Sequence, residues 1–492
     1  MASESIPTTL SYNALEFGST AGEPCRVSPA LLGSREFRAD YGIKFAYLTG
    51  AMYKGIASKE LVIAMGRAGL MGFLGTGGLS FDRVEADLLH IQAQLRPGQA
   101  YGMNLLHHLD APEIEERTVD LYLKHGVSHI EVAAFMRVTP SLVRYRLLGI
   151  RRGASGEIEP ARRLLAKVSR PEVAAAFMSP APPEMVRGLR DSGKLTPAEA
   201  ELGSLVPLAN EICVEADSGG HTDQGVAFAL LPAMFALRSE LTRKFGYRRS
   251  IKIGAAGGIG TPEAAAAVFV MGADFILTGS INQCTVEAGT SDAVKDLLQD
   301  LNVQDTAYAP AGDMFELGAK IQVVKKGVFF PARANKLYEL YQRCNSLDEI
   351  DLATRNQIQD RYFKRSFLEV WEETRNYYLT AHPAKVQELE RNPKQKMAAV
   401  FKWYFAMTSR LAQQGDPSQK INYQVHCGPA LGAFNQRVKA TRLEHWRDRH
   451  VADLAEFIMQ EAAVLMNQRF AQFTDRNSSF ESPLHARSEI GA

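Results

Sequence analysis

The 492-residue sequence predicts an α/β protein built on a (β/α)8 TIM barrel, with helical insertions and a mostly helical C-terminal region. Between residues 41 and 310, eight short and almost continuously apolar segments alternate with helical ones, as expected of parallel strands buried on both faces. Beyond about residue 310 this alternation stops and helical periodicity takes over. A doubly wound parallel sheet is the alternative, because periodicity does not show that a sheet closes. The number of strands favours the barrel.

The expected strands are short, and several end in glycine. They span residues 45–50, 71–78, 101–106, 129–134, 164–168, 211–216, 251–256 and 275–277. Helices are expected between them, for example over residues 58–68 and 111–125. Residues 1–40 carry no strong pattern and are expected to form an irregular lead-in.

Two insertions interrupt the alternation, at about residues 137–163 and 180–209. The first is rich in arginine, and the second predicts two short helices within residues 183–203. Insertions of this kind usually form lids or interaction surfaces over the active face. In the C-terminal region, residues 311–492, helices are expected over 317–324, 334–344, 354–380, 393–414 and 443–473.

The composition, with 46% hydrophobic and 23% charged residues, is that of an ordinary soluble globular protein. The formal net charge of +1 gives no reason to expect a nucleic-acid or membrane partner. No apolar run reaches about 18 residues and the first residues show no leader pattern, so we expect neither a membrane span nor a signal peptide. The five cysteines are scattered, which suits a reducing cytoplasm and argues against a disulfide framework or a metal site.

Residues 251–280 predict a strand, a glycine turn, a helix that begins after Thr261, and a second strand. Backbone N–H groups at neighbouring strand ends bind phosphate without side chains, and in (β/α)8 barrels the loops after strands seven and eight are the usual phosphate site. The residues in these two turns are Gly257, Gly258, Gly279 and Ser280. We therefore expect a phosphate to bind there.

The stretch after the sixth strand contains Gly219, Gly220 and His221. Barrel catalysis takes place at the carboxyl ends of the strands. The glycines let backbone approach a flat ligand, and a histidine titrates near neutrality, so it can donate or accept a proton. A histidine that only caps a turn is the structural alternative. Cys284 has no base nearby in the sequence and is expected to be a small buried hydrophobe.

Two further strand ends belong to the same predicted face. Asn104, at the end of the third strand, offers a side-chain amide to a ring edge or a ribityl chain. The backbone of Gly50, Ala51 and Met52, after the first strand, can stack against a flat ring. Taken alone, residues of either kind at a strand end more often have only a packing role. Together with the phosphate turns and His221 they describe a site for a phosphorylated planar cofactor.

These residues resemble the FMN-dependent barrels of nitronate monooxygenases and of FMN-type enoyl-ACP reductases. Three further strings resemble more closely the PfaD-type trans-acting enoyl reductases of polyketide and polyunsaturated-fatty-acid synthases: residues 53–58 (YKGIAS), 330–335 (FPARAN) and 427–435 (CGPALGAFN). The likeness covers about residues 30–470. It includes the helical C-terminal region, which simpler nitronate monooxygenases lack.

The resemblance implies reduction of the α,β double bond of an enoyl thioester on an acyl carrier protein, with FMN as bound cofactor and NADPH as reductant. His221 would then be the acid or the enolate stabiliser. The arginine-rich insertion, which includes Arg151 and Arg152, is expected to be either a docking surface for the acidic carrier protein or a solvated loop.

Two other functions stay open at this point. One is an oxygen-using, nitronate monooxygenase-type FMN oxidase, and the other is a non-catalytic flavin-binding component of a synthase. The sequence does not fix the oligomeric state, monomer or homodimer, nor the acyl chain, the stereochemistry of reduction or the choice of nicotinamide cofactor.

Overall fold

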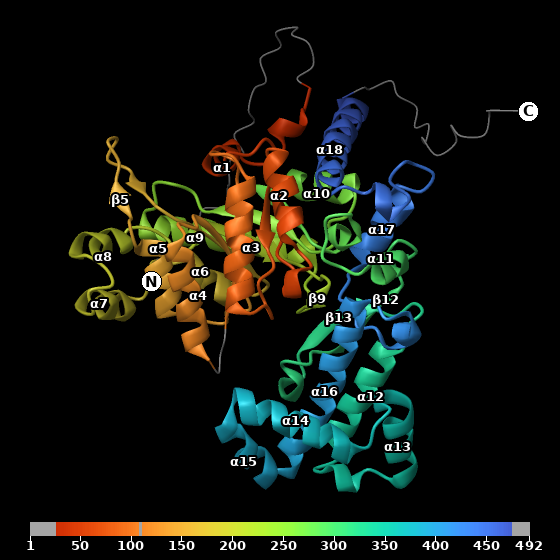
Figure 1. The fold of residues 1–492 in the computed structure, drawn as a ribbon. Helices are drawn as coiled ribbons and strands as arrows, with labels where there is room; N and C mark the ends of the chain where they lie inside the picture. The colour runs from red at the N-terminus through yellow and green to blue at the C-terminus, as the bar shows by residue number, and fades with distance from the viewer. Residues whose placement is uncertain (1–25, 108–110, 475–492) are drawn as a thin grey trace, which may run out of the picture.

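Eight parallel strands close into a barrel (Figure 1), which confirms the predicted fold class. The computed structural model describes residues 26–107 and 111–474. β1 lies between β2 and β11, with Leu48 opposite both Met71 and Leu277, so the first and last strands join the sheet into a ring. The strands are β1 (Tyr47–Thr49), β2 (Met71–Leu74), β3 (Gly102–Leu106), β4 (His129–Ala133), β7 (Arg163–Val168), β8 (Glu211–Glu215), β10 (Lys252–Ala256) and β11 (Phe275–Thr278).

The helices around the barrel begin at side-chain caps that the sequence supplies. Ser58, Ser80, Thr139 and Thr261 each accept a hydrogen bond from a backbone N–H of the first helical turn. The seven helices that follow the first seven strands are α2 (Lys59–Arg67), α3 (Phe81–Gln94), α4 (Pro112–Lys124), α5 (Pro140–Leu147), α6 (Pro171–Met178), α9 (Ala227–Phe245) and α10 (Pro262–Val270).

The eighth position of the helical ring is filled from the end of the chain. α18 (Val451–Thr474) packs against α10 on one side and α2 on the other. The chain therefore leaves the barrel after β11, builds the helical region, and returns to close the ring (Figure 1). The expected division of the chain at residue 310 stays a prediction. Among the described residues no helix combines the length and apolar character needed to cross a membrane.

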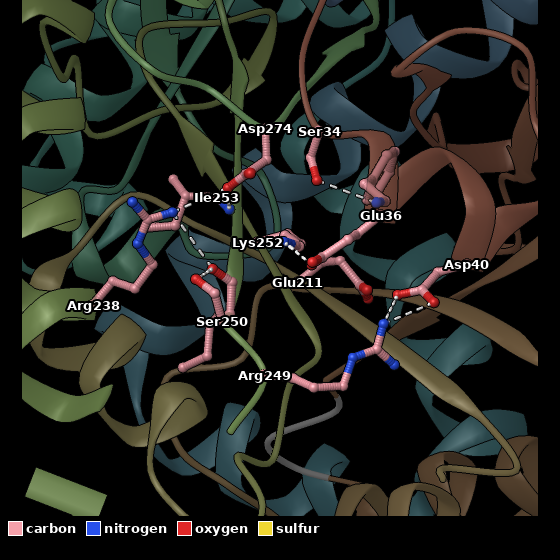
Figure 2. Close-up of polar contacts among 12 residues, drawn as sticks. Ser34, Glu36, Asp40, Glu211, Arg238, Arg249, Ser250, Lys252, Ile253 and Asp274 are labelled. Carbon is pink, nitrogen blue, oxygen red and sulfur yellow. Dashed lines mark hydrogen bonds and ion pairs between the residues drawn. The ribbon is translucent and has the colours of Figure 1, made fainter. Parts of the chain in front are cut away.

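A short helix, α1 (Arg35–Tyr41), closes the amino end of the barrel through polar contacts (Figure 2). The hydroxyl of Tyr41 donates to Oε2 of the buried Glu211, at 2.9 Å. Arg163 bridges Glu211 (3.1 Å) and Asp40 (2.8 Å), and Arg249 also pairs with Asp40. Because these charges are paired across α1, β7 and β8, the polar residues at the amino end have a structural role and hold α1 against the barrel.

Both insertions lie at this amino end, so the expectation that they cover the active face is wrong. The first predicted insertion includes the barrel helix α5, and its remainder runs from α5 to β7; the second runs from α6 to β8. Connections from a helix to the next strand lie opposite the loops that follow strands. The guanidinium of Arg146 is buried and donates to the backbone oxygen of Leu208, just before β8. The insertions contain β5 (Arg151–Arg152), β6 (Ile158–Glu159) and the two expected short helices, α7 (Pro183–Asp191) and α8 (Pro197–Gly203).

The helical region has a hydrophobic core of its own, centred on Phe315, Phe330 and Phe401. The helix expected over 393–414 is found at those bounds, and the one expected over 354–380 is broken at Lys364, which has a φ of 56°. The region contains α12 (Phe330–Arg343), α13 (Leu352–Gln357), α14 (Phe367–Ala381), α15 (Pro383–Arg391), α16 (Pro393–Gln414) and α17 (Pro429–Arg437). α11 (Asp292–Leu298) precedes the region, and its buried apolar residues belong to the core cluster of the barrel.

A three-stranded antiparallel sheet joins the helical region to the barrel. It consists of β12 (Thr306–Pro310), β13 (Lys320–Val324) and β9 (Gly220–His221), with β13 in the middle. The helix expected over 317–324 is therefore wrong. Its β-branched residues Ile321 and Val323 pack into the core as strand residues, and pairing partners remote in sequence decided the conformation.

Candidate active site

The predicted glycine–glycine–histidine stretch forms β9, which is held from both sides by the C-terminal part of the chain. Gly220, with a φ of 88°, lies opposite Gln322 of β13. A Cβ atom on Gly219 would lie 2.7 Å from the backbone nitrogen of Gly428, so only glycine admits that segment. The loop after β8 is thus fixed by residues about 100 and 200 positions further along the chain.

His221 projects at the junction between the barrel and the helical region. Its Nε2 lies 2.9 Å from Oδ1 of Asp313, which stands in the loop between β12 and β13, and the imidazole is 45% exposed. Burial opposes a charged imidazole, but the hydrogen bond and the charge of Asp313, with help from Glu215, raise the pKa of His221. No hydrogen bond joins Nδ1 of His221 to another described residue. That nitrogen is free to meet a ligand.

The two predicted phosphate turns lie side by side at the carboxyl ends of β10 and β11. Gly257 and Gly258 have φ values of 81° and 73°, and the backbone of Gly257 packs against that of Ala216 at the end of β8. A Cβ atom placed on Gly258 or on Gly279 would have no other atom within 4 Å, so both positions face open space. Among the described residues, neither of these two N–H groups donates to a protein acceptor. These turns fit an anionic group of phosphate size.

The N-terminus of α17 borders the same turns, a contribution that we did not predict. The N–H of Gly428, the N-cap residue of α17, donates to Oγ of Ser280 at 2.9 Å. The backbone of Ala430, in the first turn of this helix, contacts Gly260. A helix N-terminus favours negative charge. The glycine–proline pair that opens α17 was the available signal, because proline is common at the first helical position.

The loop after β1 is anchored by a buried carboxylate. The N–H of Ala51 donates to Oε2 of Glu131 at 2.9 Å, and the N–H of Gly50 donates to the backbone oxygen of Thr278. The backbone of Met52 packs against Gly75. The Asn104 amide donates to the backbone oxygen of Glu131 at 3.0 Å. The structure therefore brings residues 50–52 and Asn104 together around Glu131, and their contact with a ligand stays a prediction.

Three charged residues inside the barrel were missed by the sequence reasoning. Nζ of Lys167 lies 3.3 Å from Glu131 and 3.7 Å from Glu215, so a lysine sits between carboxylates of the two neighbouring strands. Burial disfavours the charge on Lys167, but Glu215 and Glu131 together raise its pKa. The hydroxyl of Ser218 donates to Glu215 at 2.9 Å, just before the glycine pair. The signal in the sequence was one charged residue within each of these otherwise apolar strands, which would have indicated this charged group inside the barrel.

Another histidine lies beside His221. The rings of His426 and Tyr53 stack, with centroids 5.6 Å apart. Burial, together with the positive charge of His221, lowers the pKa of His426 to about 4, so this ring is neutral near pH 7.

Cys284, which we expected to be a packing residue, is buried, and burial raises the pKa of its thiol to about 11. Neither group competes with His221 as a proton donor at neutral pH.

The chain is similar to proteins of known biosynthetic systems. A family model described as the inserted helical domain of [acyl-carrier-protein] S-malonyltransferase matches residues 344–423. The polyketide biosynthesis protein PksE of Bacillus subtilis is 57% identical over 438 residues, which are 89% of this chain and 57% of PksE. The polyketide biosynthesis protein ThaF of Burkholderia thailandensis is 52% identical over 446 residues, 90% of this chain and 38% of ThaF. A component of the polyunsaturated fatty acid synthase of Thraustochytrium sp. is 44% identical over 429 residues, 86% of this chain and 28% of that protein. The chain thus spans little more than half of PksE and less of the other two.

Solved structures extend the comparison. The enoyl reductase domain of MlnA, from the macrolactin biosynthesis cluster of Bacillus amyloliquefaciens, is 47% identical with a TM-score of 0.87, covering 90% of this chain and 99% of that domain. FabK from Thermotoga maritima, at 15% identity and a TM-score of 0.53, covers 89% of this chain and 98% of FabK, and shares the fold alone. Because the MlnA domain is matched over nearly its whole length, the chain belongs to the family of PfaD-type enoyl reductases.

Proposed function

We propose that this chain is a trans-acting enoyl reductase, which reduces the α,β double bond of an enoyl thioester carried on an acyl carrier protein. FMN is the proposed bound cofactor and NADPH the proposed reductant. The names of the relatives support this, since the MlnA domain is an enoyl reductase domain and the others belong to polyketide and polyunsaturated fatty acid synthesis. The match of residues 344–423 to a domain of an acyl-carrier-protein enzyme supports the carrier-bound substrate.

One observation carries the proposal. The strand that contains His221 lies against the same segment, residues 427–428, that bonds to the second phosphate turn. The proposed proton donor and the proposed phosphate turns are therefore linked through one segment at the carboxyl end of the barrel, where barrel enzymes have their active sites.

The residues present fit FMN. The N–H groups of Gly258 and Gly279, with the hydroxyl of Ser280, would hold its phosphate, because space and unused donors coincide there. The hydroxyl of Ser280 accepts a hydrogen bond from Gly428, and its proton would turn from the neighbouring Cys427 thiol to the phosphate. Backbone at 50–52 and 219–220 would border the ring. When bound, FMN supplies the hydride for Cβ.

His221 is the proposed acid. As hydride reaches Cβ, negative charge develops on the thioester oxygen, and a positioned donor stabilises it. With Nε2 committed to Asp313, the protonated ring presents Nδ1–H to that oxygen or to Cα. Asp313 thus orients the imidazole and favours its protonated form, because its hydrogen bond and charge raise the pKa of His221. The Glu131–Lys167–Glu215 triad positions the two flanking loops, through Ala51 and Ser218.

The test is consumption of NADPH by the flavin-loaded protein when an enoyl thioester is added under anaerobic conditions. A saturated acyl thioester of the same length is the control, and it should cause none. Oxidation of a nitroalkane at the expense of oxygen, without enoyl reduction, would identify the oxidase instead. Flavin binding without turnover of any of these compounds would identify the non-catalytic synthase component.

A further inference from the structure

The turn that follows residues 50–52, after β1, contains a lysine in an unusual backbone conformation. Lys54 has a φ of 53°, in the left-handed region that side chains other than those of glycine and asparagine rarely adopt. Its N–H donates to the backbone oxygen of Gly77 at 2.6 Å, and the next N–H, of Gly55, donates to Gly75 at 3.0 Å. The glycine-rich loop after β2 therefore holds Lys54 in this conformation. Strained residues of this kind are concentrated at functional sites.

The ammonium group of Lys54 has no acidic partner. Its Nζ lies 3.3 Å from Oγ of Ser409, on α16, and the next residue on that helix is Arg410. Within residues 26–107 and 111–474, neither Lys54 nor Arg410 forms an ion pair. Burial and the charge of Arg410 both lower the pKa of Lys54. A lysine and an arginine that carry like charges in the same neighbourhood without a counter-charge favour the binding of an anion there.

This pair lies at the proposed active site but apart from the FMN phosphate turns. Tyr53, the neighbour of Lys54, bonds through its hydroxyl to Ser409 and stacks on His426. Burial lowers the pKa of His426, and the nearby charges of His221 and Lys54 lower it further. The cations therefore stand where the barrel meets α16, on the side of His221 that faces the helical region.

We propose that Lys54 and Arg410 form a second phosphate site, which binds the phosphate of a reactant. Lysine supplies a point charge and arginine a planar fork, the two usual ways of binding a phosphate oxygen. Two reactants of the proposed reaction carry a suitable group: the phosphopantetheine arm that bears the acyl chain, and the 2′-phosphate of NADPH. The inference rests on the proposed function, and its test separates these two sources.

The test uses Lys54→Gly and Arg410→Gln, each in the flavin-loaded protein. Lys54→Gly removes the charge and also relieves the left-handed conformation, so its melting temperature should equal or exceed that of the parent. Lys54→Arg keeps the charge. Arg152→Gln, at the opposite end of the barrel, is the matched control for a lost surface cation.

Two ligand pairs that differ by one phosphate are compared: enoyl-phosphopantetheine with enoyl-pantetheine, and NADPH with NADH. We expect the KM of one phosphorylated member to rise about tenfold or more in Lys54→Gly and Arg410→Gln, with its unphosphorylated counterpart unchanged. The pair that responds identifies the source of the phosphate. Lys54→Arg should retain the preference, and Arg152→Gln should match the parent.

Calorimetric titration with phosphopantetheine, pantetheine, NADPH and NADH repeats the comparison without turnover. Selective loss of affinity for a phosphorylated ligand supports the site even if no enoyl substrate is reduced, so the two proposals fail separately. Equal losses within both pairs, or no change in either, would overturn the inference.

Discussion

His221 and Asp313 face each other across the junction of the barrel and the helical region, with Nε2 of His221 2.9 Å from Oδ1 of Asp313. The two residues lie 92 positions apart in the sequence. They meet because β9 and the loop between β12 and β13 belong to one small sheet. In the proposed mechanism the helical region therefore contributes Asp313, which raises the pKa of the proposed acid.

Asp313→Asn tests this contribution. Asp313 raises the pKa of His221, so the protonated acid persists to higher pH in the parent protein. Without that charge the pKa falls, and the decline of kcat/KM for enoyl reduction with rising pH should begin at lower pH. The measurement is a pH profile from about pH 6 to 9. Asp223→Asn, which removes a carboxylate paired with Arg170 nearby, is the control. An unshifted alkaline limb in Asp313→Asn would contradict the assignment.

His221→Ala separates the two halves of the reaction. A proton donor matters only after flavin has been reduced, so the variant should keep FMN and accept hydride from NADPH at a near-normal rate. Transfer to the enoyl thioester should slow by roughly 10²–10⁴-fold, the usual contribution of general acid catalysis. Stopped-flow of each half-reaction measures both rates. His221→Gln should recover part of the loss if hydrogen bonding to the thioester oxygen dominates. Slow flavin reduction with normal enoyl reduction would assign His221 to NADPH binding.

Gly279→Asp tests the phosphate cradle. A Cβ atom at this position would meet no other atom within 4 Å, so a side chain there is accommodated without a clash. The new carboxylate would repel the phosphate, and we expect FMN to be lost from a folded protein. Gly279→Asn has the same shape without the charge and should retain more flavin. Flavin content after gel filtration, with circular dichroism for folding, provides the measurement. Stoichiometric FMN in Gly279→Asp would place the phosphate elsewhere.

Charge reversal at Arg151 and Arg152 should leave the KM for carrier-bound substrate unchanged. Both residues are exposed on the hairpin that precedes β7, at the amino end of the barrel. A carrier protein must deliver its arm to the carboxyl end, so the docking role considered for this insertion has lost its structural basis. Steady-state kinetics with carrier-bound and pantetheine-bound substrate give the comparison. A KM raised only for the carrier-bound form would show that the carrier protein does reach this hairpin.

Lys167→Met should destabilise the barrel. Lys167, 16% exposed, separates the buried carboxylate of Glu131 from the partly exposed carboxylate of Glu215, and its loss leaves two like charges without compensation. Breaking a buried pair costs about 3–5 kcal/mol. Burial already raises the pKa of Glu131, and without Lys167 it rises further. The variant's folded state then binds more protons than its unfolded state, so the defect should shrink as the pH falls. Chemical denaturation at pH 5 and pH 8 measures it, and equal losses at both values would exclude the electrostatic cause.

The sequence by itself determined the eight strands, because buried parallel strands carry continuous apolar runs and their glycine-ended turns are local signals. The phosphate turns and the stretch around His221 could be predicted for the same reason. The number of strands favoured a barrel, and the pairing of β1 with β11 established that the sheet closes. Helices with strong local periodicity, such as α16, were also predictable.

Tertiary structure alone decided the rest. Residues 320–324 became a strand because β12 and β9 offered pairing partners, which outweighed helical composition. α18 became the eighth barrel helix because its apolar face fitted between α10 and α2. Asp313 reached His221, and Lys54 met Ser409, only through chain folding across large sequence separations. Such contacts depend on distance in space, for which a single sequence contains no local signal.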